Sequence, residues 1–161
     1  MRDEYAVLSF PLSLLIIVIV TACVISLFFV CLTHLWDDSQ RSQVSNELHR
    51  LVSEAQLMFE YADDASQTTL EVSFPPSLDY LVLGGLPSTA RDIKINRSLD
   101  ERESNNYYFR MRNGETSVFH SSVRFSGNTT DTIAVLFPGT YTLRLELKIF
   151  KGRSYVTVTQ H

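Results

Sequence analysis

Hydrophobic residues follow three successive patterns along this chain, and each pattern predicts a different kind of element. In the first, no residue from Tyr5 to Trp36 carries a fixed charge, and the stretch from Leu12 to Leu32 is almost wholly apolar. About 20 apolar residues that rise roughly 1.5 Å each cross a hydrocarbon core of about 30 Å. This pattern predicts a transmembrane anchor over residues 1–36, whose span includes Leu12, Leu15, Ile19, Ala22, Ser26 and Phe29.

Two other interpretations of the apolar segment stay open. One is a cleaved signal peptide, although the apolar region of such a peptide is typically about 7–15 residues long. The other is a lipoprotein, because Val20-Thr21-Ala22-Cys23 resembles a lipoprotein cleavage site, yet Val24 to Leu32 stays apolar where polar residues would follow a lipidated cysteine. The very short N-terminal tail favours a single-pass anchor in the cell membrane, with an extracytoplasmic C-terminal domain.

The second pattern is helical and amphipathic. Apolar side chains recur at spacings of 4, 3, 4 and 3 residues, which predicts a helix over residues 37–64 whose packing face is formed by Val44, Leu48, Leu51, Ala55 and Met58. Neither Gly nor Pro occurs between Leu12 and Phe74, so we expect one helix from about Ser9 to Ala62. The alternative is a break at Asp37–Gln40 followed by a separate surface helix.

The third pattern has a period of two and predicts seven to nine short strands over residues 66–161. Strands are expected at Leu70–Phe74, Leu78–Leu83, Arg91–Asn96, Val123–Phe125, Ile133–Phe137 and Tyr141–Ile149. With the long helix packed on one face of this sheet, the predicted fold class is α+β, with a C-terminal antiparallel, β-sandwich-like domain.

Two hairpins can be predicted to the residue. A two-residue turn at Asn113-Gly114 would pair Phe109 with Val118, Tyr108 with Phe119 and Tyr107 with His120. A turn at Lys151-Gly152 would pair Leu147 with Val156 and Leu145 with Val158, so that apolar side chains meet on one buried face.

Composition narrows the classes of function. The formal net charge of the 161 residues is −4, and acids and bases are interspersed, so no basic face predicts nucleic-acid binding. Both cysteines, Cys23 and Cys31, lie in the apolar run, which excludes a disulfide framework and a Cys-type zinc site in the rest of the chain.

No arrangement of residues indicates catalysis, a cofactor or a metal, so we predict a protein that is not an enzyme. HExxH, GxSxG, Walker and GxGxxG motifs do not occur. The acidic cluster of Asp100, Glu101 and Glu103 is a weak calcium candidate, because Arg102 lies within it. Asn96 and Asn128 begin glycosylation sequons, which are the candidate modification sites.

The order of a long helix, apolar and then amphipathic, before a β domain resembles the type IV pilin architecture. Arg2-Asp3-Glu4 with Ala6-Val7 and Ser9, ahead of a run rich in Leu, Ile and Val, resembles the N-termini of archaeal type IV pilin-like proteins. The expected sandwich is also similar to that of membrane-anchored archaellum stator proteins. These resemblances imply a role in assembling or anchoring a surface filament.

The chain departs from that family near its N-terminus. No Lys-Gly or Arg-Gly site for a class III signal peptidase precedes the apolar run, Leu8 interrupts the Ala-Val-Ser series, and Pro11 is unusual there. These departures favour an accessory protein that does not polymerise over a major pilin. The expected partners are membrane lipid, other pilin-like or envelope proteins, and further copies of the chain. A second hypothesis is a tethered sandwich that binds a cell-envelope ligand such as a glycan. A third, an ectoenzyme, has no motif in its favour.

Overall fold

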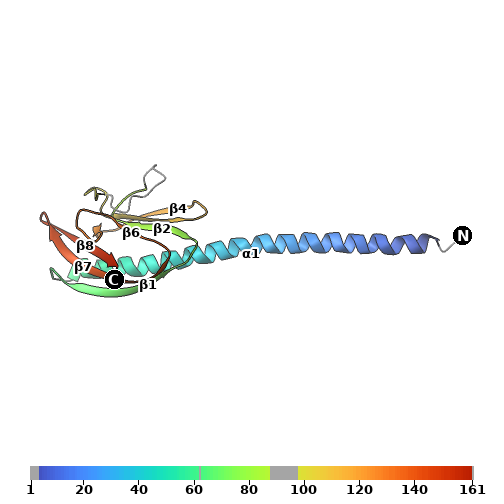
Figure 1. Cartoon of the computed structure of the whole chain (residues 1–161), viewed down its shortest axis with the longest axis horizontal. Coiled ribbons are helices and arrows are strands. Elements are labelled where there is room, and N and C mark those ends of the chain that lie inside the picture. The colour runs from blue at the N-terminus through green and yellow to red at the C-terminus, as the bar shows by residue number, and fades with distance from the viewer. Residues whose placement is uncertain (1–3, 62, 88–97, 161) are drawn as a thin grey trace. The chain divides into compact units, whose positions relative to one another are not determined.

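The computed structural model describes residues 4–61, 63–87 and 98–160. Its one helix, α1, comprises Glu4–Tyr61, and its assignment is continuous through Asp37–Gln40 (Figure 1). By their internal contacts the residues divide into two units, 1–39 and 40–161. The amphipathic half of α1 therefore belongs to the same unit as the strands.

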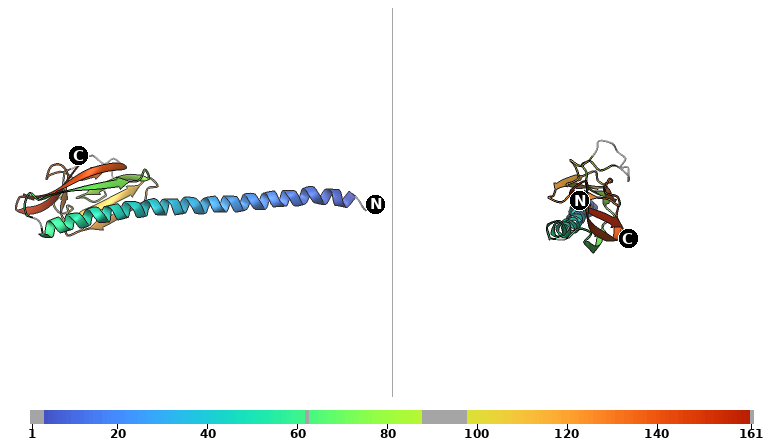
Figure 2. Two further views of the ribbon diagram at one scale, coloured as in Figure 1. Left: turned by 90° about the horizontal axis from the view of Figure 1, so that it is seen from below. Right: turned by 90° about the vertical axis from the view of Figure 1, so that its left-hand side faces the viewer.

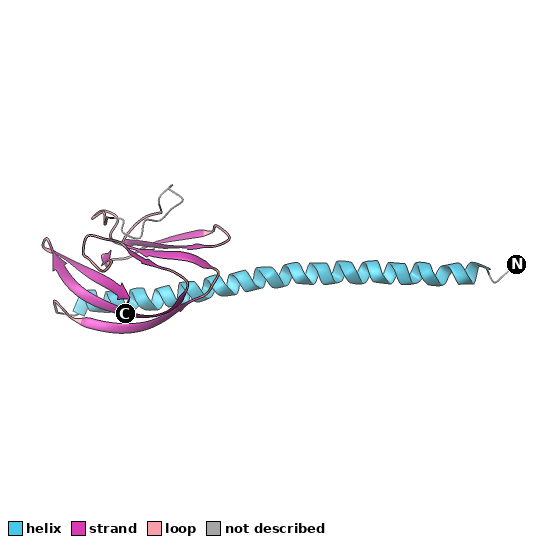
Figure 3. Ribbon diagram, in the orientation of Figure 1, coloured by secondary structure: helices cyan, strands magenta, loops and turns pink. Residues whose placement is uncertain are grey.

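The described strands form two four-stranded sheets, so the α+β class is confirmed (Figure 3). The first sheet has the order β1-β7-β8-β5 and the second the order β4-β3-β2-β6. All pairings are antiparallel except the short parallel pairing of β5 with β8. The strands are β1 Gln67–Phe74, β2 Leu78–Leu83, β3 Asn106–Met111, β4 Thr116–His120, β5 Phe125–Ser126, β6 Ala134–Leu136, β7 Gly139–Phe150 and β8 Arg153–Gln160.

The alternating pattern located these strands well. The strand predicted at Leu78–Leu83 is β2, residue for residue, and the strand predicted at Ile133–Phe137 contains β6. The strand predicted at Val123–Phe125 begins later, since β5 holds only Phe125 and Ser126. The strand predicted at residues 91–96 lies outside the described residues.

The hairpin between β7 and β8 has the predicted register. Leu147 pairs with Val156, and Leu145 pairs with Val158. Lys151 and Gly152 both have positive φ, of 50° and 75°, as the two central residues of a type I′ turn require. The side chain of Ile149, expected on the same face as Leu145 and Leu147, is exposed because it lies near the tip of this hairpin.

The predicted register of the hairpin between β3 and β4 was wrong by one residue. Tyr107 pairs with Phe119 and Tyr108 with Val118, and His120 pairs with Asn106 instead of Tyr107. The loop has three residues, because the Met111 amide donates to the Glu115 carbonyl at 2.8 Å and the Gly114 amide donates to the Met111 carbonyl at 2.9 Å.

Gly114 explains this longer loop. Its φ of +92° is suited to the left-handed residue that closes a three-residue hairpin loop. A shift of one residue exchanges the two faces of β4. Phe119 consequently stacks on Tyr107, with ring centroids 5.3 Å apart, and Val118 is exposed.

The core of the 40–161 unit contains side chains of α1 and of both sheets. The predicted stripe of α1 is buried in one hydrophobic cluster with Leu81 of β2, Phe109 of β3, Leu145 of β7 and Val156 of β8. Figure 2 shows this half of α1 running beside the strands. The helix is therefore part of the core of this unit and contributes to its stability.

We expect Leu51→Ala to lower the free energy of unfolding of the 40–161 unit by about 2–5 kcal/mol, the usual cost of a cavity at a buried leucine. Leu51 is 0% exposed. The matched control is Leu57→Ala in the same helix, since Leu57 is 53% exposed. Chemical denaturation of the full chain in detergent measures both values. Equal effects of the two variants would contradict the burial of this face.

Candidate functional site

The apolar half of α1 is long and apolar enough to cross a membrane, and none of its most apolar stretch is buried inside the protein. The predicted span residues Leu15, Ile19, Ala22, Ser26 and Phe29 are all exposed. The side chain of Leu12, the remaining predicted span residue, lies outside the described side chains. This exposed surface is apolar on every side, which is typical of a helix that lipid surrounds.

Hydroxyl groups in this segment hydrogen-bond to the helix itself. Thr21 donates to the carbonyl of Ile17, and Ser26 donates to the carbonyl of Ala22, each at 2.8 Å. The Thr33 hydroxyl likewise donates to the carbonyl of Val30 at 2.8 Å. In hydrocarbon an unsatisfied polar group costs several kcal/mol, so these internal bonds make the segment compatible with lipid.

The five predicted packing residues of α1, from Val44 to Met58, are between 0% and 7% exposed. Their contacts lie within the hydrophobic cluster shared with the strands. Their burial agrees with the expectation that the long helix packs on a face of the sheet.

Polar contacts connect α1 to the edge strand of the second sheet, β4. Arg41 forms an ion pair with Glu115 at 2.5 Å and donates to the hydroxyl of Ser117 at 3.1 Å. Further along the helix, the Gln56 side chain donates to the Ser121 hydroxyl, just after β4, at 3.4 Å. Exposed ion pairs contribute at most about 1 kcal/mol, so these contacts orient the helix more than they stabilise it.

A second set of contacts reaches the edge strand of the first sheet, β1. Arg50 donates both to Glu47, one turn earlier, and to the backbone carbonyl of Glu71 in β1. The Ser77 hydroxyl, between β1 and β2, donates to the Gln40 side chain at 2.7 Å. The amphipathic half of α1 thus contacts an edge strand of each sheet.

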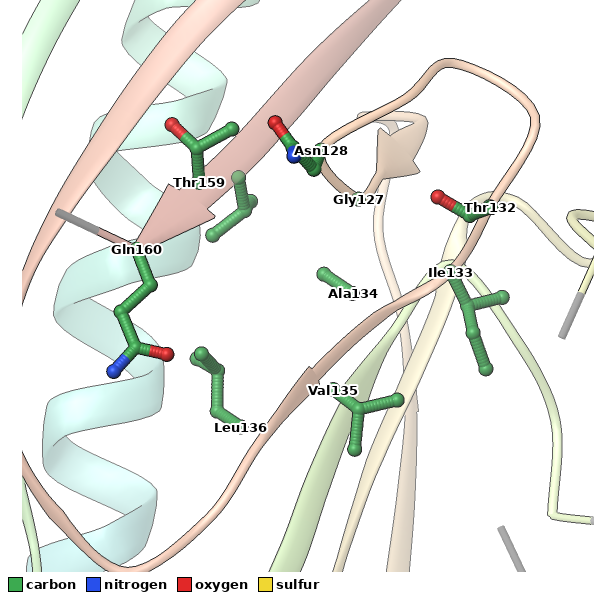
Figure 4. Close-up of a pocket in the computed structure, with 10 residues that line it drawn as sticks. Gly127, Asn128, Thr132, Ile133, Ala134, Val135, Leu136, Thr159 and Gln160 are labelled. Atoms are coloured by element: carbon green, nitrogen blue, oxygen red, sulfur yellow. The ribbon is translucent and has the colours of Figure 1, made fainter. Parts of the chain in front are cut away.

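A cleft of about 250 Å³ lies between β6 and the end of β8 (Figure 4). Among the described residues, β6 pairs only with β2, and β8 beyond Thr157 pairs only with β7. No charged side chain lines the cleft. Its described lining consists of Gly127, Asn128, Thr132, Ile133, Ala134, Val135, Leu136, Val158, Thr159 and Gln160.

The residues considered for metal binding or catalysis have other contacts. Glu101 pairs with Arg153 at 2.9 Å, and the Asp100 carboxylate accepts the backbone N–H of Arg102 at 3.0 Å. The ring of His120 lies within 3.3 Å of the side-chain amides of Asn105 and Asn106. Within residues 13–160 as far as they are described, no group of three His, Cys, Asp or Glu side chains could hold a metal ion.

Of the two sequon asparagines, Asn128 is exposed in the turn between β5 and β6, where it lines the cleft. Asn96 lies outside the described residues. No pattern in the sequence predicts the cleft. Its lining comes from three segments whose neutral side chains carry no motif, and only the packing of the strands brings these segments together.

Two side chains in the 40–161 unit, Glu146 and Tyr107, have shifted pKa values. A hydrogen bond with Lys148, 3.0 Å away, lowers the pKa of Glu146, and the nearby Gln67 and Arg144 act in the same direction. Burial raises the pKa of Tyr107, whose ring is 4% exposed. Neither group faces the cleft, so these shifts concern stability and not a reaction.

Comparison with known proteins does not assign the chain to a group: no family model, no curated protein and no solved structure matches it. The function proposed below is argued from the residues and their geometry.

We expect Tyr107 to make the unfolding free energy sensitive to alkaline pH. The pKa of Tyr107 is raised in the folded state. The contribution of this residue to the unfolding free energy is therefore fully present below the pKa of the unfolded chain, about 10, and falls as the pH rises above that value. Unfolding of the full chain and of Tyr107→Phe should differ by a constant amount up to about pH 9. Above that pH, the native chain should lose more stability than the variant. The control is Tyr61→Phe, because Tyr61 is 80% exposed; an identical pH profile for all three chains would contradict the prediction.

Proposed function

We propose that this protein is a membrane-anchored, pilin-like accessory subunit of a cell-surface filament system, and that it acts through protein–protein packing. The observation that carries the proposal is that α1 contains two different surfaces. The described side chains from Ser13 to Thr33 are exposed and mostly apolar, whereas the stripe from Val44 to Met58 lies in the core of the strand-containing unit. The same division of one helix is the architecture that the sequence resembles.

In this proposal, the two sheets and the amphipathic half of α1 act as one sandwich-like body on the extracytoplasmic side of the membrane. The shared hydrophobic cluster supports this body, because its side chains come from the helix and from both sheets. The partners of the exposed faces are other pilin-like or envelope proteins.

Lateral packing of the helix then has to use the segment in the membrane. The stripe from Val44 to Met58 is occupied by the chain's own strands, while the large apolar side chains from Leu14 to Leu32 are exposed. Lipid supplies no hydrophobic drive between helices, so association there depends on close van der Waals packing. Ala22, Cys23 and Ser26 are the small side chains that permit close approach.

One observation favours a second candidate, a tethered module that binds an envelope ligand. The uncharged cleft between β6 and β8 lies in the β domain, so binding of a ligand there does not require the helix to pack with another protein. In this case the membrane segment serves as an anchor alone, and its surface has no packing role.

Membrane insertion is tested by the double variant Ile19→Asp/Val24→Asp. Each aspartate near the centre of a span costs roughly 2.5–3.5 kcal/mol of insertion free energy. We expect the native chain to stay in the membrane pellet after an alkaline carbonate wash, and a large part of the variant to enter the supernatant. The matched control, Val118→Asp/Ile149→Asp, changes two exposed residues of β4 and β7 and should stay in the pellet. Release of the native chain itself would refute the anchor.

Oxidative cross-linking separates the structural subunit from the tethered module. In a Cys23→Ser/Cys31→Ser background, single cysteines at positions 23, 24, 25 and 26 sample the helix circumference in steps of about 100°. Lateral packing predicts disulfide-linked products, with itself or with a co-expressed partner, at one or two of these four positions in native membranes. A tether predicts none at any position, and that result would leave the module as the function.

A further inference from the structure

One end of the 40–161 unit, formed by the last turns of α1 and the β7–β8 hairpin, exposes apolar side chains. Among the described residues of this unit, five large apolar side chains are exposed, and the three most exposed are Tyr61, Ile149 and Leu57, at 80%, 58% and 53%. Leu57 and Tyr61 are one turn apart and share a face of α1. We call the surface that these three side chains form the tip.

Backbone hydrogen bonds hold the two elements of the tip next to each other. The Ala65 amide donates to the Leu147 carbonyl, and the Leu147 amide donates to the Ser66 carbonyl, each at 3.0 Å. Ala65 follows the end of α1, and Leu147 lies just before the hairpin turn. Both views of the unit show the end of α1 and this hairpin at the same end (Figures 1 and 2).

Acidic side chains flank the tip on its helix side. Glu60, Asp63 and Asp64 are all exposed, and no basic residue occurs between positions 51 and 64. These three carboxylates form no ion pair with any residue that the structure describes. The helix side of the tip is therefore negative and open to a cation from outside the chain.

Basic side chains flank the tip on its hairpin side. Lys148, Lys151 and Arg153 surround the turn, and no acidic residue occurs between positions 147 and 160. Lys148 pairs with Glu146, and Arg153 pairs with Glu101. Lys151 is exposed and has no ion pair within the described part of the chain. The two sides of the tip thus have opposite charge.

We propose that the tip binds the tip of a second copy of the chain in a two-fold symmetric dimer. Such an interface uses the same patch on both subunits, so the patch must be complementary to itself. Here the acidic helix side of each copy faces the basic hairpin side of the other, and the apolar side chains meet between them. A partner with a single sign of charge would be repelled by one of the two sides.

This inference rests on the proposed function, in which the chain acts through protein–protein packing, and it names one surface and one partner for that packing. An exposed apolar patch with a polar rim is typical of an interaction site. The tip belongs wholly to the 40–161 unit, so its pairing does not depend on how the membrane segment packs.

The test exchanges the charges of the tip in the full chain, in density-matched detergent. Lys151→Glu/Arg153→Glu makes both sides acidic, and Asp63→Lys/Asp64→Lys makes both sides basic. Sedimentation equilibrium should show a dimer for the native chain and a dissociation constant at least tenfold higher for each variant alone, because like charges then face each other. An equimolar mixture of the two variants should dimerise again, which also shows that both are folded.

A second pair of variants tests the apolar part of the tip. Tyr61→Ser/Ile149→Ser should raise the dissociation constant of the dimer at least tenfold. The matched control, Val118→Ser/Phe137→Ser, changes the other two exposed apolar side chains of the unit and should dimerise as the native chain does.

Three results would each overturn the inference. A native chain that stays monomeric at all concentrations would leave the tip to a different protein. Equal dimerisation of the native chain and both charge variants would assign self-association to another surface, such as the membrane segment, and the proposed function would stand. A mixture that does not recover the dimer would exclude the two-fold pairing of helix side with hairpin side. Failure of the proposed function has a separate sign, the release of the native chain by the carbonate wash.

Discussion

The 40–161 unit depends on the burial of one stripe of helix α1. Val44, Leu48, Leu51 and Ala55 recur on one face of the helix, and they share a cluster with Phe109 and Leu145 of the two sheets. Removing a single buried leucine from such a cluster usually costs about 2–5 kcal/mol, which is a large part of a domain's net stability. The strands therefore need the second half of α1 as part of their core.

The same helix also contacts one edge strand of each sheet. Arg50 donates to the Glu71 carbonyl of β1, and Arg41 donates to Ser117 of β4. The edges on the other side, β6 and the end of β8, border an uncharged cleft instead. One amphipathic segment thus contributes to the core and contacts one edge strand of each sheet.

The burial of the stripe also limits which surface of α1 is exposed to another protein. A helix that is apolar and then amphipathic has two apolar surfaces, and either could in principle contact another protein. In this chain the stripe around Leu51 is occupied by strands, whereas the side chains around Ile19 are exposed. Between helices in lipid, only close packing and polar contacts remain to hold partners together. The short side chains of Ala22 and Ser26 favour such packing, but the Ser26 hydroxyl already bonds to its own helix.

The sequence by itself determined the features that arise from local periodicity. The apolar run, the stripe from Val44 to Met58 and the alternation in β7 each repeat over many residues, so α1, the α+β class and the β7–β8 register were predicted. The β3–β4 register was not, because Asn113-Gly114 suits both a two-residue and a three-residue loop, and only the backbone hydrogen bonds of Met111 choose between them. Only the tertiary structure decided which residues of the two sheets share a core with the stripe, and that Asn128, Ala134 and Gln160 meet at one cleft. These outcomes depend on contacts between residues far apart in the chain, and a pattern along the sequence carries no record of such contacts.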